Sequence, residues 1–441
     1  MSKLTWPFAN LDGVWSHIEA SDESLVLPRV GHAAVSMGDW VLLLGGVQPD
    51  QASREREVSC IDARTATWHR LQCFGNAPTG RAWHTATAVE GGRVLVFGGS
   101  NGRKLFGDLH ELQLAETEGD EPPAGARWSH PTTTGEMPPS RMGHTATCVP
   151  GGRLWMFGGF TKASANKGYA GELYELDVST MDWHRLEPRQ DDDEPPIAGR
   201  LGAASFVHDE TFLVFGGSIS GKAVNELLAL GTGARVTLAR VQAKGQAAVT
   251  PRHSAAATLS ACGRYAFVHG GCVCDKEEGI NRVLGDLLQL SLDTYTWAVL
   301  KPSKGAVVPG LRFKHVLTTV GAPRASGGAR LLLFGGSAAG RAVPPTLPEG
   351  STPCAHPMRP PGASEGSGRS YAARRAASAA WKLAVAAGAR LSWRPIRGPP
   401  LSASRQRRLR RGPRGRAALA PLARAPRRRA RQARRLRLTG R

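Results

Sequence analysis

Histidines three residues after an arginine are the first candidates for chemistry in this sequence. Imidazole is a common zinc ligand, so a set of histidines at a shared spacing could suggest a metal site. Each of these histidines, however, occupies the same place in a different copy of a repeated unit, so we expect each ring to bond local backbone. The pattern Arg-x-x-His ends at His32, His84, His144 and His315.

No other residues form a convincing catalytic or metal-binding set. Cys272-Val-Cys274 has neither the CxxC spacing nor a second cysteine pair, which argues against zinc or redox chemistry. No carboxylate pair and no nucleophile–base arrangement stands out along the chain. We therefore predict no catalytic residues, no metal and no cofactor.

The dominant signal is a Gly-Gly doublet that closes a short apolar run and recurs every 53 to 65 residues. A period of this length indicates stacked supersecondary units. No helix start with Lys-Ser/Thr follows the doublets, so they are not phosphate loops, and we expect a structural role as close-approach positions at a strand end. The doublets are Gly45-Gly46, Gly98-Gly99, Gly158-Gly159, Gly216-Gly217, Gly270-Gly271 and Gly335-Gly336.

Each unit is interpreted as four short strands. Small and β-branched residues after the Arg-x-x-His step predict a first strand, and the apolar run before the doublet predicts a second. An Asp/Glu-Leu step begins the third strand, and a tryptophan marks the fourth in most units. We expect these tryptophans to pack between neighbouring units; they are Trp15, Trp68, Trp128, Trp183 and Trp297.

These features resemble kelch repeats over roughly residues 12–337. The resemblance implies an all-β fold, a six-bladed kelch-type β-propeller of four-stranded antiparallel blades, within the galactose-oxidase-like propeller superfamily. It says less about function, because kelch-type propellers include adaptors, cytoskeletal partners, ligase substrate receptors and occasional enzymes.

The two ends of the repeat suggest how the ring closes. Residues 14–19 look like a fourth strand with no first three before it, whereas residues 312–336 supply the first and second strands of a sixth unit. In kelch propellers the amino-terminal strand usually completes the last blade, which would give six blades here. No Asp/Glu-Leu step follows Gly336, so the last blade is predicted to lack its third strand.

The charge of the chain changes where the repeat ends. The chain has 441 residues and a net charge of +21, yet its first 340 residues carry 32 basic and 34 acidic residues. Residues 341–441 carry 24 Arg and one Lys against two acids. We divide the chain into a lead-in at 1–11, a propeller at 12–340 and an Arg/Ala/Pro-rich tail at 341–441, predicted to be disordered or out of frame. A basic nucleic-acid-binding arm, a nuclear-import patch and a linker remain alternatives.

One face of the predicted propeller collects the loops. In an antiparallel blade the loops between the second and third strands emerge on the same side as the loops between blades, and binding residues usually lie on such loops. Each loop between the second and third strands of the first five units carries a base, and these bases could bind an acidic peptide. The competing interpretation is a solvated surface. The bases are Arg54, Arg56, Arg103, Lys104, Lys162, Lys167, Lys222, Lys276 and Arg282.

The predicted function is a non-catalytic protein–protein interaction scaffold or adaptor, a monomeric propeller that binds a protein partner on its loop face. Alternatives are a nucleic-acid-associated scaffold using residues 342–441 and a propeller enzyme or small-ligand binder at the axial channel. No apolar stretch reaches the length of a membrane span, and the amino end lacks a secretory h-region. Seven cysteines and no Asn-x-Ser/Thr site favour the cytoplasm, or the nucleus if the basic tail acts there.

Overall fold

The second strand of each repeat is continuously apolar because it is covered on both faces by neighbouring blades. In β8 (Arg93–Phe97) and β14 (Arg153–Phe157) every residue after the arginine is buried. The first strand is different: in β7 (Thr85–Val89) only the central residue is buried. The second strands, which pack between blades, are therefore buried along almost their whole length, whereas the first strand β7 at the ring axis is buried only at its centre.

The computed structural model describes residues 15–18, 29–47, 57–63, 65, 67–115, 123–163, 168–190, 195–231, 236–275, 279–302, 308–320, 330–338, 383–386 and 392–395. All of the predicted lead-in and most of the tail lie outside these residues, as do Arg54, Arg56, Lys167 and Lys276. The described part is all-β except for one turn of 3-10 helix, Gln246–Ala248. No helix in it is long and apolar enough to span a bilayer.

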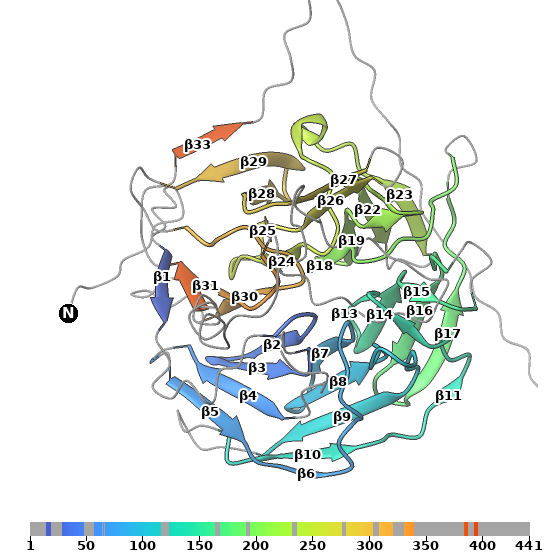
Figure 1. The fold of residues 1–441 in the computed structure, drawn as a ribbon. Helices are drawn as coiled ribbons and strands as arrows, with labels where there is room; N and C mark the ends of the chain where they lie inside the picture. Colours follow the sequence, from blue (N-terminus) through green and yellow to red (C-terminus); the bar gives the residue numbers. More distant parts are fainter. Residues whose placement is uncertain are drawn as a thin grey trace, which may run out of the picture. The chain divides into compact units, whose positions relative to one another are not determined.

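Six antiparallel blades form the fold (Figure 1). Blade 1 contains β2 (Ala33–Met37), β3 (Trp40–Leu44), β4 (Val58–Asp62) and β5 (Thr67–Leu71). Blade 2 contains β7, β8, β9 (Leu109–Leu114) and β10 (Ala126–Ser129), with β6 (Cys73–Gly75) parallel to β10. Blade 3 contains β13 (Thr145–Val149), β14, β16 (Leu173–Asp177) and β17 (Asp182–Leu186), with β11 (Thr134–Gly135) parallel to β17.

The remaining blades follow the same order. Blade 4 contains β18 (Ala204–His208), β19 (Thr211–Phe215), β22 (Leu227–Gly231) and β23 (Thr237–Arg240). Blade 5 contains β24 (Ala256–Leu259), β25 (Tyr265–His269), β28 (Leu287–Ser291) and β29 (Thr296–Lys301), with β33 (Ser392–Pro395) added at its outer edge. Blade 6 contains β30 (Val316–Val320), β31 (Arg330–Phe334), β32 (Leu383–Ala386) and β1 (Trp15–Ile18).

The ring closes through contacts between blade 1 and blade 6. The six first strands contact one another in a closed cycle, in which β2 touches both β7 and β30, and they surround the centre of Figure 1. The amino-terminal strand β1 is the fourth strand of blade 6, as the sequence predicts. The third strand does not come from the residues directly after Gly336. Instead β32, from the predicted tail, lies between β31 and β1.

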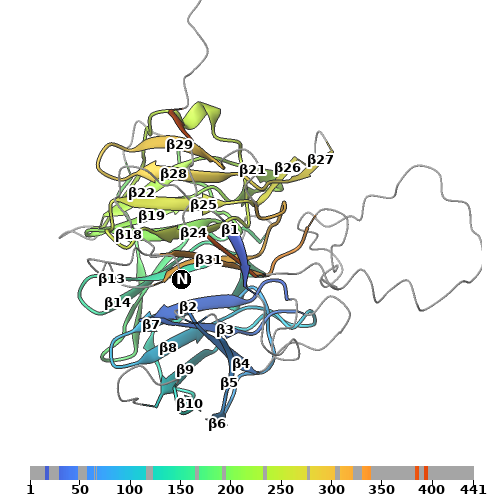
Figure 2. The same ribbon diagram turned by 90° about the vertical axis from the view of Figure 1, so that its left-hand side faces the viewer.

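The long loops emerge on one side of the ring, which we call the loop face. Two loops between second and third strands form a small sheet there, β20 (Ser218–Ile219), β21 (Lys222–Ala223), β26 (Cys272–Asp275) and β27 (Ile280–Val283), which joins blades 4 and 5. Another such loop pairs β12 (Arg141–Met142) with β15 (Phe160–Thr161). Figure 2 shows β21, β26 and β27 on the side opposite the hairpin between β13 and β14.

Candidate functional site

An arginine, buried in blades 1 to 5 and half-buried in blade 6, holds the loop-face end of each blade. In blade 2, Arg81 Nη1 donates to the carbonyl oxygen of Gly98 at 3.0 Å, so its guanidinium fixes the turn at the Gly-Gly doublet. The equivalent bond recurs in all six blades at 2.9–3.4 Å. The arginines are Arg29, Arg81, Arg141, Arg200, Arg252 and Arg312.

In blades 2 to 5 the same arginine pairs with the acid of the Asp/Glu-Leu step. Arg81 binds Asp108 through two bonds of 2.6 and 2.9 Å, and Arg252 binds Asp286 through two bonds of 2.8 Å. Burial alone would raise the pKa of Asp108, but hydrogen bonds from Arg81 and His110 hold it well below its usual range. The acid that marks the third strand in the sequence is therefore half of an ion pair that secures this strand to the doublet.

The Gly-Gly doublets join adjacent blades. The second glycine of each doublet donates its N–H to the carbonyl of the arginine of the next blade, and Gly336 closes the series by donating to Arg29 at 3.1 Å. At Gly98 (φ +67°) an added Cβ would lie 2.7 Å from the carbonyl oxygen of Arg141. Close approach between blades thus requires glycine here.

A second closed series of backbone hydrogen bonds surrounds the axis at the loop face. The residue two positions after each arginine donates its N–H to the carbonyl of its counterpart in the preceding blade, at 2.7–3.2 Å. All six have a positive φ. We call them the axial ring: Gly31, Trp83, Gly143, Gly202, Ser254 and Lys314. Sequence reasoning missed this ring, because only three of its members are glycine and its bonds join residues about 50 or more positions apart.

Two side chains of the axial ring bring an aromatic ring and a charge together. Lys314 Nζ lies 5.1 Å from the centre of the Trp83 ring and 5.4 Å from that of Phe313. These distances allow a cation–π interaction. The exposed Val308 and Leu311 lie just before this segment, on the loop between blades 5 and 6. Apolar and cationic groups thus share this part of the loop face.

The repeated histidines lie between blades rather than against their own backbone alone. His144 Nε2 is 2.8 Å from Thr85 Oγ1, and His315 Nε2 is 3.0 Å from His269 Nδ1, in each case across a blade boundary. The ring of His84 lies beside Gly45 of the preceding blade, where it would be 2.6 Å from an added Cβ. Burial, together with the Arg81 charge, lowers the pKa of His84 to about 3, so this ring is neutral. The expectation of purely local backbone bonds was therefore too narrow.

Four of the five repeated tryptophans of the fourth strands lie at blade boundaries. The ring centre of Trp183 is 5.4 Å from Phe97 of the preceding blade, and that of Trp297 is 4.8 Å from Phe215. Trp68 of blade 1 lies 5.3 Å from Phe334 of blade 6 and thus spans the closing boundary. Trp128 clusters with Val35 and other core residues of blade 1. Trp15 lies opposite Ala386 in the backbone register.

The described bases of the predicted binding surface are exposed on loops of the loop face. Arg103 and Lys104 are adjacent, and Lys104 Nζ lies 5.0 Å from the ring centre of Phe106. Lys222 is 62 % exposed and pairs with Asp275 at 2.9 Å, so part of its charge is already compensated. Lys162 and Arg282 are exposed in blades 3 and 5. The structure distributes these bases around the rim and does not gather them into one pocket.

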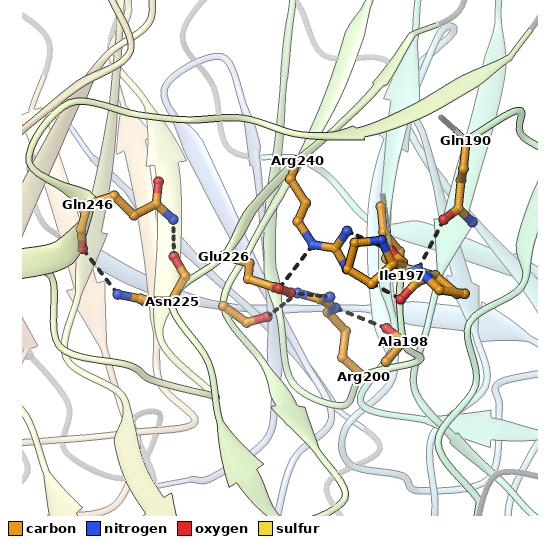
Figure 3. Close-up of polar contacts among 11 residues, drawn as sticks. Gln190, Ile197, Ala198, Arg200, Asn225, Glu226, Arg240 and Gln246 are labelled. Carbon is orange, nitrogen blue, oxygen red and sulfur yellow. Dashed lines mark hydrogen bonds and ion pairs between the residues drawn. The ribbon is translucent and has the colours of Figure 1, made fainter. Parts of the chain in front are cut away.

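Polar contacts fix the loops between blades around blade 4 (Figure 3). Arg240 donates to Glu226 at 3.2 Å and to the carbonyl of Pro195 at 2.8 Å, and Arg200 binds the same carboxylate at 2.8 Å. Asn225 donates to the carbonyl of Gln246 at 3.1 Å in the next loop. These loops therefore present their outer side chains from a fixed backbone.

Cys272 and Cys274 lie in the small sheet of the loop face, as free thiols. Cys272 and Cys274 are buried, and their thiols donate to Asn281 Oδ1 at 3.0 Å and to the carbonyl of Gly221 at 3.3 Å. Across the described residues, no three His, Cys, Asp or Glu side chains are arranged to hold a metal ion.

Comparison with known proteins identifies the family. A profile described as "KLHDC2/KLHL20/DRC7 Kelch-repeats domain" matches residues 31–126 and 123–336. Acyl-CoA-binding domain-containing protein 4 of Arabidopsis thaliana is 30% identical over 247 residues, which are 55% of this chain and 34% of that protein. Host cell factor 1 of Homo sapiens is 29% identical over 287 residues, 61% of this chain and 12% of that protein.

A solved structure titled "Structure of YjhT" matches with a TM-score of 0.51 and 16% identity, over 71% of this chain and 92% of that chain. At this identity the likeness shows the fold alone. The matched region spans about a third or less of the length of the two curated relatives described above. The family profile covers most of the chain, and every blade carries the doublet that joins it to the next. The chain belongs to the kelch-repeat family.

Proposed function

We propose that this protein is a non-catalytic interaction scaffold that binds a protein partner on the loop face. The observation that carries the proposal is the combination of exposed bases and exposed apolar side chains on loops whose backbone is fixed by the arginine pairs and the axial ring. A surface of this kind can bind without first ordering its loops, which lowers the entropic cost of association. Family membership supports the same conclusion.

The chemistry of the surface favours an acidic partner segment. Arg103 and Lys104 stand next to each other in blade 2, and Lys314 lies beside Trp83 near the axis. Carboxylates can bind such bases, while neighbouring apolar side chains contact Trp83 and Leu311. The backbone N–H groups of the axial ring are used in ring hydrogen bonds, which supports the rim over the axial channel as the binding region.

The test is charge reversal on the rim. The double variant Arg103→Glu/Lys104→Glu should reduce partner capture and crosslinking at least several-fold without changing the unfolding midpoint, because both side chains are exposed. The matched control is Arg127→Glu, an exposed residue on the outer strand β10. Equal loss in both variants, or no loss in either, would argue against binding at the loop face.

A further inference from the structure

The small sheet of the loop face has one paired edge and one open edge. At the β20 edge, Ser218 exchanges backbone hydrogen bonds of 2.8 and 3.0 Å with Leu201. At the other edge, β27 pairs with β26 on one side only, and Figure 2 shows it beyond β26 at the outer end of the sheet. Among the described residues, no backbone group outside β26 bonds to Ile280–Val283. The sheet that joins blades 4 and 5 therefore ends in a strand that can still pair.

The hydrogen-bond register of the hairpin shows which backbone groups of β27 face the open edge. Cys272 exchanges bonds of 2.9 and 3.0 Å with His253, so its pair with Val283 in the hairpin is a non-hydrogen-bonded one. Hydrogen-bonded and non-hydrogen-bonded pairs alternate along an antiparallel ladder, so the pair of Cys274 with Asn281 is also non-hydrogen-bonded. The N–H and carbonyl groups of Asn281 and Val283 therefore point away from β26, toward the open edge.

The outer face of the small sheet carries basic side chains. Side chains alternate between the two faces of a strand, so Arg282 lies on the face opposite the buried Cys272 and Cys274. Arg282 is exposed, and no carboxylate in the described part of the chain forms an ion pair with it. On β21, Lys222 is 62 % exposed and pairs with Asp275. An acid on a strand added beside β27 would therefore meet Arg282 without breaking an ion pair that the described residues form.

The charge of Arg282 argues against a second copy of the chain as the added strand. If β27 of two copies paired antiparallel, the register in which both use the outward groups of Asn281 and Val283 would place Arg282 opposite its own counterpart. Like charges directly opposite each other destabilise a sheet, whereas opposite charges stabilise it. The open edge therefore fits a strand that carries an acid at this position.

We propose that β27 accepts an extended acidic segment of a partner protein, which adds antiparallel to it as a further strand of the small sheet. The main chain of the segment exchanges hydrogen bonds with Asn281 and Val283, as in other cases of strand addition. One of its carboxylates lies opposite Arg282, where it makes a charge-assisted hydrogen bond. The inference rests on the proposed scaffold function, because it names the form of the segment that the loop face binds and the place where it binds.

The experiment uses the full chain and a labelled peptide of about eight residues in which glutamate alternates with valine. We expect saturable binding by fluorescence anisotropy. Asn281→Pro removes an outward N–H but no ladder bond to β26, so it should weaken binding about tenfold and leave the fold intact. Asn281→Ala is the matched control: it removes the same side chain, which accepts a bond from the Cys272 thiol, but keeps the N–H. Absent binding, or equal binding by the two variants, overturns the proposal.

A second variant tests the charge without relying on Asn281→Pro to fold. Arg282→Glu should weaken binding of the glutamate–valine peptide about tenfold, because it places like charges opposite each other. A lysine–valine peptide tests the sign of the charge, since the adjoining turn carries Glu277 and Glu278. It should bind the unaltered chain more weakly than the glutamate–valine peptide does and should gain affinity in Arg282→Glu. Stronger binding of the lysine–valine peptide to the unaltered chain would overturn the acidic partner.

Charge reversal at Arg103 and Lys104 separates this inference from the proposed function. The double variant should leave peptide binding unchanged, because its bases lie on the loop of blade 2 rather than on the small sheet. If this variant abolishes peptide binding and Asn281→Pro does not, the peptide binds the bases of blade 2. Strand addition at β27 would then be wrong, whereas binding at the loop face would still stand.

Discussion

Replacing Trp68 by alanine tests the closing boundary of the ring, where blade 1 meets blade 6. The side chain is 3 % exposed and its ring centre lies 5.3 Å from Phe334. The two blades are far apart in sequence, so their contact depends on packing rather than on a short connecting loop. Trp183 is the matched internal case: it is fully buried and lies 5.4 Å from Phe97, across the boundary between blades 2 and 3.

Truncating a buried tryptophan to alanine costs about 3–5 kcal/mol in the free energy of unfolding. If the ring is closed as described, Trp68→Ala and Trp183→Ala should fall in the same range, because the two side chains have nearly equal burial and similar aromatic partners. Phe74→Ala is the control: Phe74 is 56 % exposed, and its truncation should change stability by less than about 1 kcal/mol.

The assay is urea unfolding followed by far-UV circular dichroism, with both the midpoint and the m-value recorded. A repeat protein can unfold in stages, so a changed m-value would signal that one blade separates before the others. A loss below about 1 kcal/mol for Trp68→Ala beside a loss of about 3–5 kcal/mol for Trp183→Ala would refute the closed ring.

Two further predictions concern the doublets and the histidines. Gly99→Ala should lower the free energy of unfolding by about 2–3 kcal/mol, because the new Cβ would lie 2.7 Å from the Ala82 carbonyl oxygen at φ +91°. Gly38→Ala is the control: Gly38 has φ +64° and no atom within 4 Å of an added Cβ, so urea unfolding should show a loss of only about 1 kcal/mol. Since the folded-state pKa of His84 is about 3 and the unfolded value is about 6.5, the folded protein binds fewer protons and loses stability as pH falls from about 6.5 toward 3. Unfolding curves at several pH values should therefore show a weaker decline for His84→Gln, and an unchanged pH dependence would contradict the neutral buried ring.

The blade architecture could be predicted from the sequence because its causes are local and repeated. A continuously apolar second strand, a glycine doublet and an acid–leucine step each reflect the surroundings of one short segment. Repetition over six units separates these signals from chance. The closing role of β1 was predictable for the same reason, since residues 14–19 match a fourth strand and no other.

The features that the sequence did not reveal depend on contacts between distant segments. Trp83 and Lys314 adopt positive φ because the ring hydrogen bonds require it, although their residue types give no sign of this. The sheet that joins β21 to β26 connects two loops about 50 residues apart. Binding residues are still harder to predict from the sequence, because an exposed base such as Lys162 looks the same in sequence whether it contacts a partner or only water. The predicted role of the nine bases therefore stays a prediction.

The arginine–carboxylate pair of blades 2 to 5 shows which contacts a blade of this protein normally has, and blade 6 can be compared with it. The arginine recurs in every blade, so a chance arrangement cannot explain why Arg81, Arg200 and Arg252 each have a carboxylate at 2.6–2.8 Å. The guanidinium of Arg312 is half-buried as well, yet no carboxylate of the described residues lies within ion-pair distance of it. The first and second strands of blade 6, with Arg312, keep the form that the other blades use to bind an acid–leucine strand. Blade 6 therefore keeps the arginine and the doublet of the repeat, whereas the acid that accompanies them in blades 2 to 5 has no counterpart among the described residues.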